Sequence, residues 1–152
     1  MNQIAEPYLY LPGESELRWT GKTSTYFLAT GALTGGNFSL VEERAILNES
    51  VPLHRHDDIE SFYILEGEVL FYIGDNSRLL AVAGAFMHIP GGTVHGFRIA
   101  SDIARYLILT TPRHGEFYSA ISLPSFQATI DDSVIEEACQ RYGVEFVGPL
   151  PA

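Results

Sequence analysis

The chain has 152 residues, of which 46% are hydrophobic and 18% are charged. This length suits one domain with a substantial core, and the composition is globular rather than disordered. Nine Lys and Arg against nineteen Asp and Glu give a formal net charge of −10. Such a charge repels the phosphate backbone, so a nucleic-acid partner is not expected.

Membrane insertion and disulfide formation are also disfavoured by the sequence. No apolar run approaches the roughly 20 residues that a membrane helix needs, and the N-terminus lacks the basic start and apolar block of a signal peptide. The single cysteine, Cys139, cannot form an internal disulfide, which agrees with a reducing compartment. We therefore expect a cytoplasmic protein without a membrane partner.

From residue 8 to about residue 111, short β-rich runs alternate with Gly, Pro, Asn and Asp. This pattern predicts an all-β fold, with chain reversals at 66–68 and 74–77 where residues accept positive φ. Many short strands remove their edges by closing into a jelly-roll barrel. The predicted strands are residues 25–30, 38–47, 61–65, 69–73, 78–82, 85–89, 95–100 and 104–110.

The pattern changes after Pro112, where residues 115–121 suit one short helix. A second helix is predicted to begin with a capping box at 133–136 and to end at Gly143. Cys139 falls on the apolar face of that helix and is expected in the core. With no internal repeat or linker, residues 1–152 are expected to form one domain, with a barrel core at about 25–111 and a helical tail at about 113–150.

The residues that suggest chemistry form two segments. Residues two apart on a strand point to the same side, so His54 and His56 can present two imidazoles to one point, and Glu60 adds a carboxylate four residues later. In the second segment, the tight turn Pro90-Gly91-Gly92 precedes His95. Three imidazoles and one carboxylate suit Fe, Mn, Co, Ni, Cu or Zn in the +2 state. We expect one such metal ion, held by His54, His56, Glu60 and His95, with one or two positions left for substrate or water.

These segments resemble the two motifs of the cupin superfamily, G-x5-H-x-H-x3-4-E-x6-G and G-x5-P-x-G-x2-H-x3-N. The opening glycine of the first motif is replaced near residues 49–50, and the closing asparagine of the second is Ile99. The resemblance implies a cupin-type double-stranded β-helix and the same four metal ligands. The matching positions are His54, His56, Glu60, Gly67, Gly84, Pro90, Gly92 and His95.

The segments 26–31, 34–36 and 141–149 are similar to the small quercetin 2,3-dioxygenase-like cupins. That similarity implies a metal-dependent dioxygenase that cleaves a flavonol-like or other enolisable aromatic substrate with O2, with Glu60 as the base that takes the substrate's hydroxyl proton. Apolar residues on the faces of the ligands favour such a substrate: Phe97 and Ile99 with His95, and Phe62 and Ile64 with Glu60.

Two other functions remain open at this stage. The same metal and base could serve a non-oxidative isomerase or cyclase acting on a small ketone metabolite, and oxygen consumption separates that enzyme from a dioxygenase. A non-catalytic, metal-dependent ligand-binding cupin is the third hypothesis. The resemblance also implies a homodimer, because small barrels of this superfamily often pair sheets or exchange an N-terminal strand, and residues 8–19 are apolar enough to do so.

Other candidate residues are given structural roles. His88 and His114 receive no function, because a single histidine on a strand is more often a core or surface residue than a ligand. Asp57 and Asp58 are expected in a solvated loop at the mouth of the site. The remaining aromatic residues assigned to the barrel core are Phe62, Phe71, Phe86 and Phe97.

Overall fold

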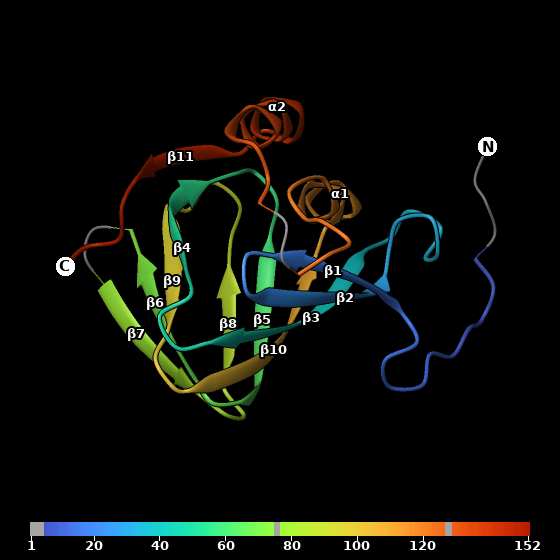
Figure 1. Cartoon of the computed structure of the whole chain (residues 1–152), viewed down its shortest axis with the longest axis horizontal. Coiled ribbons are helices and arrows are strands. Elements are labelled where there is room, and N and C mark those ends of the chain that lie inside the picture. Colours follow the sequence, from blue (N-terminus) through green and yellow to red (C-terminus); the bar gives the residue numbers. More distant parts are fainter. Residues whose placement is uncertain (1–4, 75–76, 127–128) are drawn as a thin grey trace.

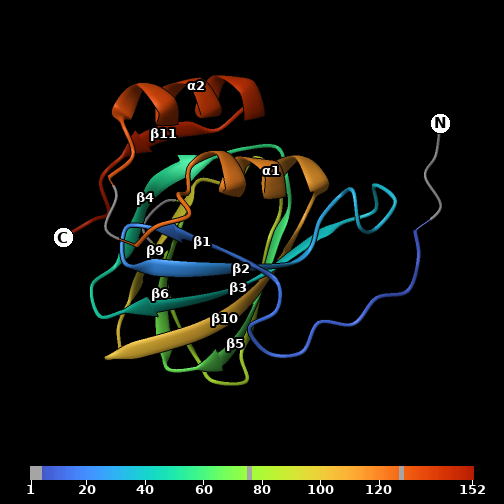
Figure 2. The ribbon, with the colours of Figure 1, turned by 45° about the vertical axis from the view of Figure 1, so that its right-hand side comes forward.

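The computed structural model describes residues 5–74, 77–126 and 129–152. Two antiparallel sheets face each other as a barrel, and two helices lie across one end (Figures 1 and 2). The predicted all-β fold is confirmed. In spatial order the first sheet contains β1 (Glu16–Thr20), β2 (Thr23–Ala29), β3 (Ser39–Ile46), β10 (Ile103–Thr110), β5 (Glu60–Glu66) and β8 (Phe86–Ile89). The second contains β11 (Glu145–Gly148), β4 (Ser50–Arg55), β9 (His95–Ile99), β6 (Glu68–Ile73) and β7 (Ser77–Val82).

Strand β10 shows how the sequence builds the barrel wall. Ala104, Tyr106 and Ile108 are buried, whereas Leu109 is 40% exposed. Successive side chains of a strand point to opposite faces, so the first three face the barrel interior. β3 pairs with β10 along its whole length and shows the same alternation of buried and exposed side chains, with Val41 facing the barrel interior.

Aromatic rings form the centre of the core. The Phe62 ring lies edge-to-face with Phe71 and Phe97, at centroid distances of 5.0 and 5.6 Å. The predicted burial of these three residues is confirmed. The prediction for Phe86 is wrong, because its side chain is 66% exposed. The alternation along β8 turns Ile89 inward and Phe86 outward.

Three strands were not predicted: β1, β4 and β11. β4 contains Pro52, which lacks the backbone N–H that pairs strands, and its register with β9 shifts between Val51 and His54. β11 is four residues long and pairs with β4 through a second irregularity. The turn expected at 74–77 includes residues 75 and 76, which lie outside the described residues.

The two helices begin earlier than the sequence suggested. Helix α1 (Pro112–Ala120) starts with Pro112, and the Thr111 hydroxyl accepts a hydrogen bond from the His114 N–H. Helix α2 (Asp132–Tyr142) has Asp131 as its N-cap, so the predicted capping box at Ser133 is wrong. The prediction that it ends at Gly143 is confirmed, with φ 68 at that glycine.

Helix α2 packs on α1 through a small second core. Ala138, Phe117 and Val144 form this cluster, and Cys139 packs against it while remaining partly exposed. This stacking holds α1 over the end of the barrel (Figure 2). In the described part of the chain, no helix is long and apolar enough to cross a membrane.

Candidate metal centre

Four residues predicted as ligands come together at the end of the barrel that α1 covers. His54 lies near the end of β4, His56 directly after it, Glu60 begins β5 and His95 begins β9. All four are buried, and each can offer one ligand atom such that these atoms lie within 4.8 Å of one another.

Strand register and a tight turn explain this convergence. His54 and His95 are direct cross-strand partners, and their ring centroids lie 4.2 Å apart. The backbone N–H of Gly92 donates to the His56 carbonyl at 2.7 Å, which ties the turn to the first histidine segment. A Cβ on Gly91 would lie 2.0 Å from the Asp57 carbonyl oxygen, so only glycine permits this approach.

Backbone carbonyls orient two of the imidazoles. His54 Nδ1 donates to the Pro52 carbonyl and His95 Nδ1 to the Thr93 carbonyl, both at 2.8 Å. Each ring therefore keeps Nε2 for the centre. Glu60 Oε1 lies 2.8 Å from His56 Nε2 and 2.9 Å from His95 Nε2. Adjacent ligands at about 2.1 Å from one cation lie about 3 Å apart, so this donor set fits a transition metal.

The protonation equilibria also suit a cation. Burial alone would raise the pKa of Glu60, but His114, His56 and His95 outweigh it and hold that pKa well below its usual range. Burial and the neighbouring His95 lower the pKa of His54 to about 4. At neutral pH the site therefore offers an ionised carboxylate and a neutral His54 imidazole, the forms that bind metals.

Two further residues, which sequence reasoning missed, complete the surroundings of Glu60. The Tyr118 hydroxyl donates to Glu60 Oε2, and His114 Nε2 lies 3.7 Å from the same oxygen. Both come from α1, which follows β10 directly, and Thr110 at the end of β10 is the cross-strand partner of Glu60. A helix that starts beside Glu60 brings its own side chains to the site, and no residue spacing in the sequence signals this contact.

Asp58 corrects a second expectation, because it is buried rather than solvated, while Asp57 is exposed as predicted. The Asp58 carboxylate accepts from the Thr111 hydroxyl at 2.8 Å and lies 3.9 Å from His114 Nδ1. His114 in turn stacks on His56, with 3.9 Å between centroids.

His56, Asp58 and His114 each have a buried polar atom without a partner. Among the described residues, three buried side-chain atoms lack a protein hydrogen-bond partner: His56 Nδ1, Asp58 Oδ2 and His114 Nδ1. Their three residues also form one cluster of possible ligands. Histidines that bind a metal normally donate their other N–H to a carboxylate, a carbonyl or water. Asp58 is the carboxylate of this cluster and therefore the candidate partner for His56.

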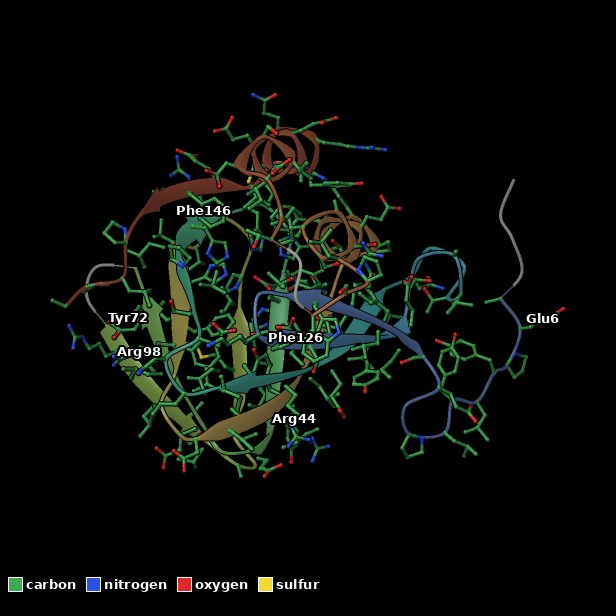
Figure 3. The ribbon with its side chains drawn as sticks, in the orientation of Figure 1. Glu6, Arg44, Tyr72, Arg98, Phe126 and Phe146 are labelled. Carbon is green, nitrogen blue, oxygen red and sulfur yellow. The ribbon has the colours of Figure 1, made fainter. Side chains whose placement is uncertain are left out.

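A cavity of about 140 Å³ adjoins the centre and reaches into the barrel. His54 and Glu60 line it together with Phe97 and Ile99, as the face-sharing argument predicted. Phe62 and Ile64 belong to the packed core. Phe146 of β11 lies over the end of β4 and contributes to the lining, with its ring 5.7 Å from His54 (Figure 3). The remaining apolar lining residues are Ala45, Val51, Ile108, Phe117 and Ile121.

The chain is similar to known proteins in both sequence and fold. Residues 46–110 match the family model Cupin_2, the cupin domain. Over 120 residues, 78% of the chain, the sequence is 32% identical to the quercetin 2,3-dioxygenase of Bacillus subtilis (strain 168). The chain is a cupin. It spans 35% of the length of that relative.

Solved structures show the same cupin fold. KdgF from Halomonas sp. superposes with a TM-score of 0.62 at 13% identity, covering 70% of this chain and 94% of that one. A predicted oxalate decarboxylase from Thermotoga maritima gives 0.62 at 18% identity, covering 68% and 98%. The polyketide cyclase RemF from Streptomyces resistomycificus gives 0.56 at 24% identity, covering 66% and 70%.

The cupin motif also explains an unusual backbone conformation. Its opening glycine precedes the first histidine by six residues, and Asn48 holds that position with φ 70. Asparagine is one of the few residues that tolerate this left-handed region. The replacement therefore lies at Asn48, and not at 49–50 as the sequence analysis placed it.

Proposed function

We propose that His54, His56, Glu60 and His95 bind one divalent transition metal, and that the chain is a metal-dependent dioxygenase acting on a flavonol-like or other enolisable aromatic substrate. One observation carries this proposal: the buried Glu60 stands where the histidine cluster meets an apolar cavity. The 32% identity to a quercetin 2,3-dioxygenase supports the substrate class.

The proposed reaction assigns a separate role to each group of residues at the site. A bound metal ion supplies a Lewis acid that polarises the substrate's oxygen atoms. Glu60, ionised at neutral pH, accepts the proton of the substrate's hydroxyl group, and Tyr118 holds its other carboxylate oxygen. The walls formed by Phe97, Ile99 and Phe146 exclude water and orient a planar ring.

Oxygen uptake tests this function. Protein reconstituted with Fe, Mn, Co, Ni, Cu or Zn is mixed with quercetin in air, and oxygen and flavonol absorbance are followed together. We expect both to fall in step with at least one metal. Absence of oxygen uptake with every metal, across several flavonols, excludes a flavonol dioxygenase.

The size of the cavity favours a second candidate function. At about 140 Å³ it is smaller than the roughly 300–1,000 Å³ of typical small-molecule sites. A compact ketone would fit without movement of α1 or β11, and Glu60 could then drive an isomerisation or cyclisation by moving a proton. Turnover of such a ketone under nitrogen would establish this alternative, because only the dioxygenase needs oxygen.

We further propose that the chain acts as a homodimer. The segment before β1 runs away from the barrel (Figures 1 and 2) and exposes apolar side chains, with Leu9 79% and Leu11 57% accessible. Such a segment is suited to pack on a second copy of the chain.

A further inference from the structure

The cavity contains a polar group that the proposed reaction does not use. Thr25, Glu43 and Tyr106 lie side by side on neighbouring strands, since Thr25 and Tyr106 are the two cross-strand partners of Glu43. All three line the cavity. The next residue along, Arg44, points outward from the barrel (Figure 3), which agrees with an inward direction for Glu43.

The row formed by Thr25, Glu43 and Tyr106 lies well inside the barrel, away from the candidate metal centre. Glu60 pairs with Thr110, whereas Tyr106, the partner of Glu43, pairs with Ile64. Four residues of a strand separate the two levels, which is roughly 13 Å at about 3.3 Å per residue. The same cavity touches both levels, so one ligand can reach from Glu60 to Glu43.

The chemistry of the row suits hydrogen bonding to a neutral group. The Thr25 hydroxyl donates to Glu43 Oε2 at 2.6 Å, and the Tyr106 hydroxyl also contacts this carboxyl group, so the three side chains form one polar group on the cavity wall. Burial raises the pKa of Glu43 to about 7, although polar contacts with Thr25 and Tyr106 oppose this. Near neutral pH the Glu43 carboxyl group is therefore present both protonated and ionised. Both forms accept a hydrogen bond, and the protonated form also donates one.

The charges around the cavity exclude an anionic ligand group at this level. Glu43 and Glu49 both line it, and its lining among the described residues includes no Lys or Arg. A phosphate or carboxylate would meet repulsion without a cation to offset it. A phenolic hydroxyl or a ketone oxygen meets a matching donor or acceptor.

We propose that Thr25, Glu43 and Tyr106 form a distal subsite that binds an uncharged hydroxyl or carbonyl group of the substrate, while its enolisable end lies at Glu60. The inference rests on the proposed function and narrows its substrate class. The substrate is a flat, largely apolar molecule with two polar ends no more than about 13 Å apart, which is the separation of the two levels along the strand.

Two flavonols test the subsite, because quercetin carries distal hydroxyl groups and 3-hydroxyflavone does not. Dissociation constants are measured by the change in flavonol absorbance on metal-loaded wild type and on Glu43→Leu, Glu43→Gln and Thr25→Val. Loss of one hydrogen bond should weaken quercetin binding to Glu43→Leu by about tenfold. Binding of 3-hydroxyflavone should change less than twofold, and Glu43→Gln should recover part of the loss. If Glu43→Leu folds poorly, Thr25→Val serves instead, and it should weaken quercetin binding by a smaller factor.

Glu42→Gln is the matched control, because Glu42 is next in the same strand but faces outward and pairs with Arg105. It should leave both constants unchanged. Equal effects of Glu43→Leu on the two flavonols would show a merely structural role and overturn the subsite. Wild type that binds neither flavonol would instead remove the proposed function, and the subsite with it.

Discussion

Glu60 carries two proposed roles, metal ligand and base, and one substitution separates them. Glu60→Gln keeps an oxygen donor but removes the negative charge and the basicity. Metal should largely remain and flavonol should still bind, while ring cleavage falls by roughly 10²–10⁴-fold, the usual contribution of a positioned base. Metal content by elemental analysis and oxygen uptake are measured on one preparation.

His95→Ala is the companion variant, because it deletes a ligand and keeps the Glu60 side chain itself. It should lower metal retention itself. Glu60→Gln protein with full metal and undiminished turnover would exclude Glu60 as the base.

Asp58 is expected to act through His56 on the affinity for metal. Its carboxylate lies 3.9 Å from Nδ1 of His114, the ring that stacks on His56, and both Asp58 Oδ2 and His56 Nδ1 are buried without a protein hydrogen-bond partner. Removing such an outer partner typically costs 10–100-fold in metal affinity. Asp58→Asn should therefore release metal to a competing chelator at correspondingly lower chelator concentration. Asp57→Asn, the exposed neighbour, should match wild type, and equal affinities in all three proteins would refute the role of Asp58.

Glu43 makes stability depend on pH. Its pKa is about 7 in the folded chain against 4.5 ordinarily, because burial disfavours the charge. The folded state thus binds more protons between these values, and stability falls as pH rises from about 4.5 to 7. The charge of Glu60 also raises the pKa of Glu43, whereas hydrogen bonds with Thr25 and Tyr106 lower it.

Glu43→Gln removes this penalty. Its free energy of unfolding should exceed that of wild type by about 1–3 kcal/mol at pH 8, and the difference should shrink toward zero near pH 4.5. Urea titrations at the two pH values measure it, with Glu42→Gln as the control. A difference that does not change with pH would mean that Glu43 titrates normally.

At the scale of elements, the tight turn at 90–92 positions His95 against the first histidine segment. Gly91→Ala would place a methyl group 2.0 Å from the Asp57 carbonyl oxygen. The backbone has to move, which should lower stability by about 1–3 kcal/mol and weaken metal retention as well. Thermal unfolding and metal content test this, and Thr93→Ala in the same turn should have little effect on either. Wild-type behaviour of Gly91→Ala would show that the turn is freely adjustable.

At this scale the sequence could predict only features that depend on residues close together in the chain. The spacing of His54 and His56 is that of two neighbours on one face of a strand, and the turn Pro90-Gly91-Gly92 lies three residues before His95. The strand β4 that carries His54 was missed, because Pro52 and a bulge break the alternation by which strands are recognised. The capping box at Ser133 failed because Asp131, two residues earlier, starts the helix instead.

The residues that complete the site depend on tertiary contacts. His114 was set aside as an ordinary histidine, yet it is 1% exposed and stacks on His56. No spacing rule connects position 114 with position 56. The connection comes from β10 ending beside Glu60 and α1 starting there, which only the register of the sheet reveals.

At the scale of the whole molecule, two apolar surfaces could join subunits. One is the N-terminal segment with Leu9 and Leu11, and the other is the outer face of the edge strand β7, where Leu80 is 54% exposed. The N-terminal segment is favoured because it extends from the barrel, where it can cross to a partner without rearranging either sheet (Figure 1).

Light scattering at micromolar concentration should therefore give the mass of a dimer for wild type and of a monomer for the double variant Leu9→Ser, Leu11→Ser. Neither substitution touches the barrel core, so circular dichroism and metal content should remain those of wild type. Leu80→Ser is the counterpart on β7 and should remain dimeric. A dimer that persists in the N-terminal variant but dissociates in Leu80→Ser would move the interface to β7, and a monomeric wild type would remove the dimer altogether.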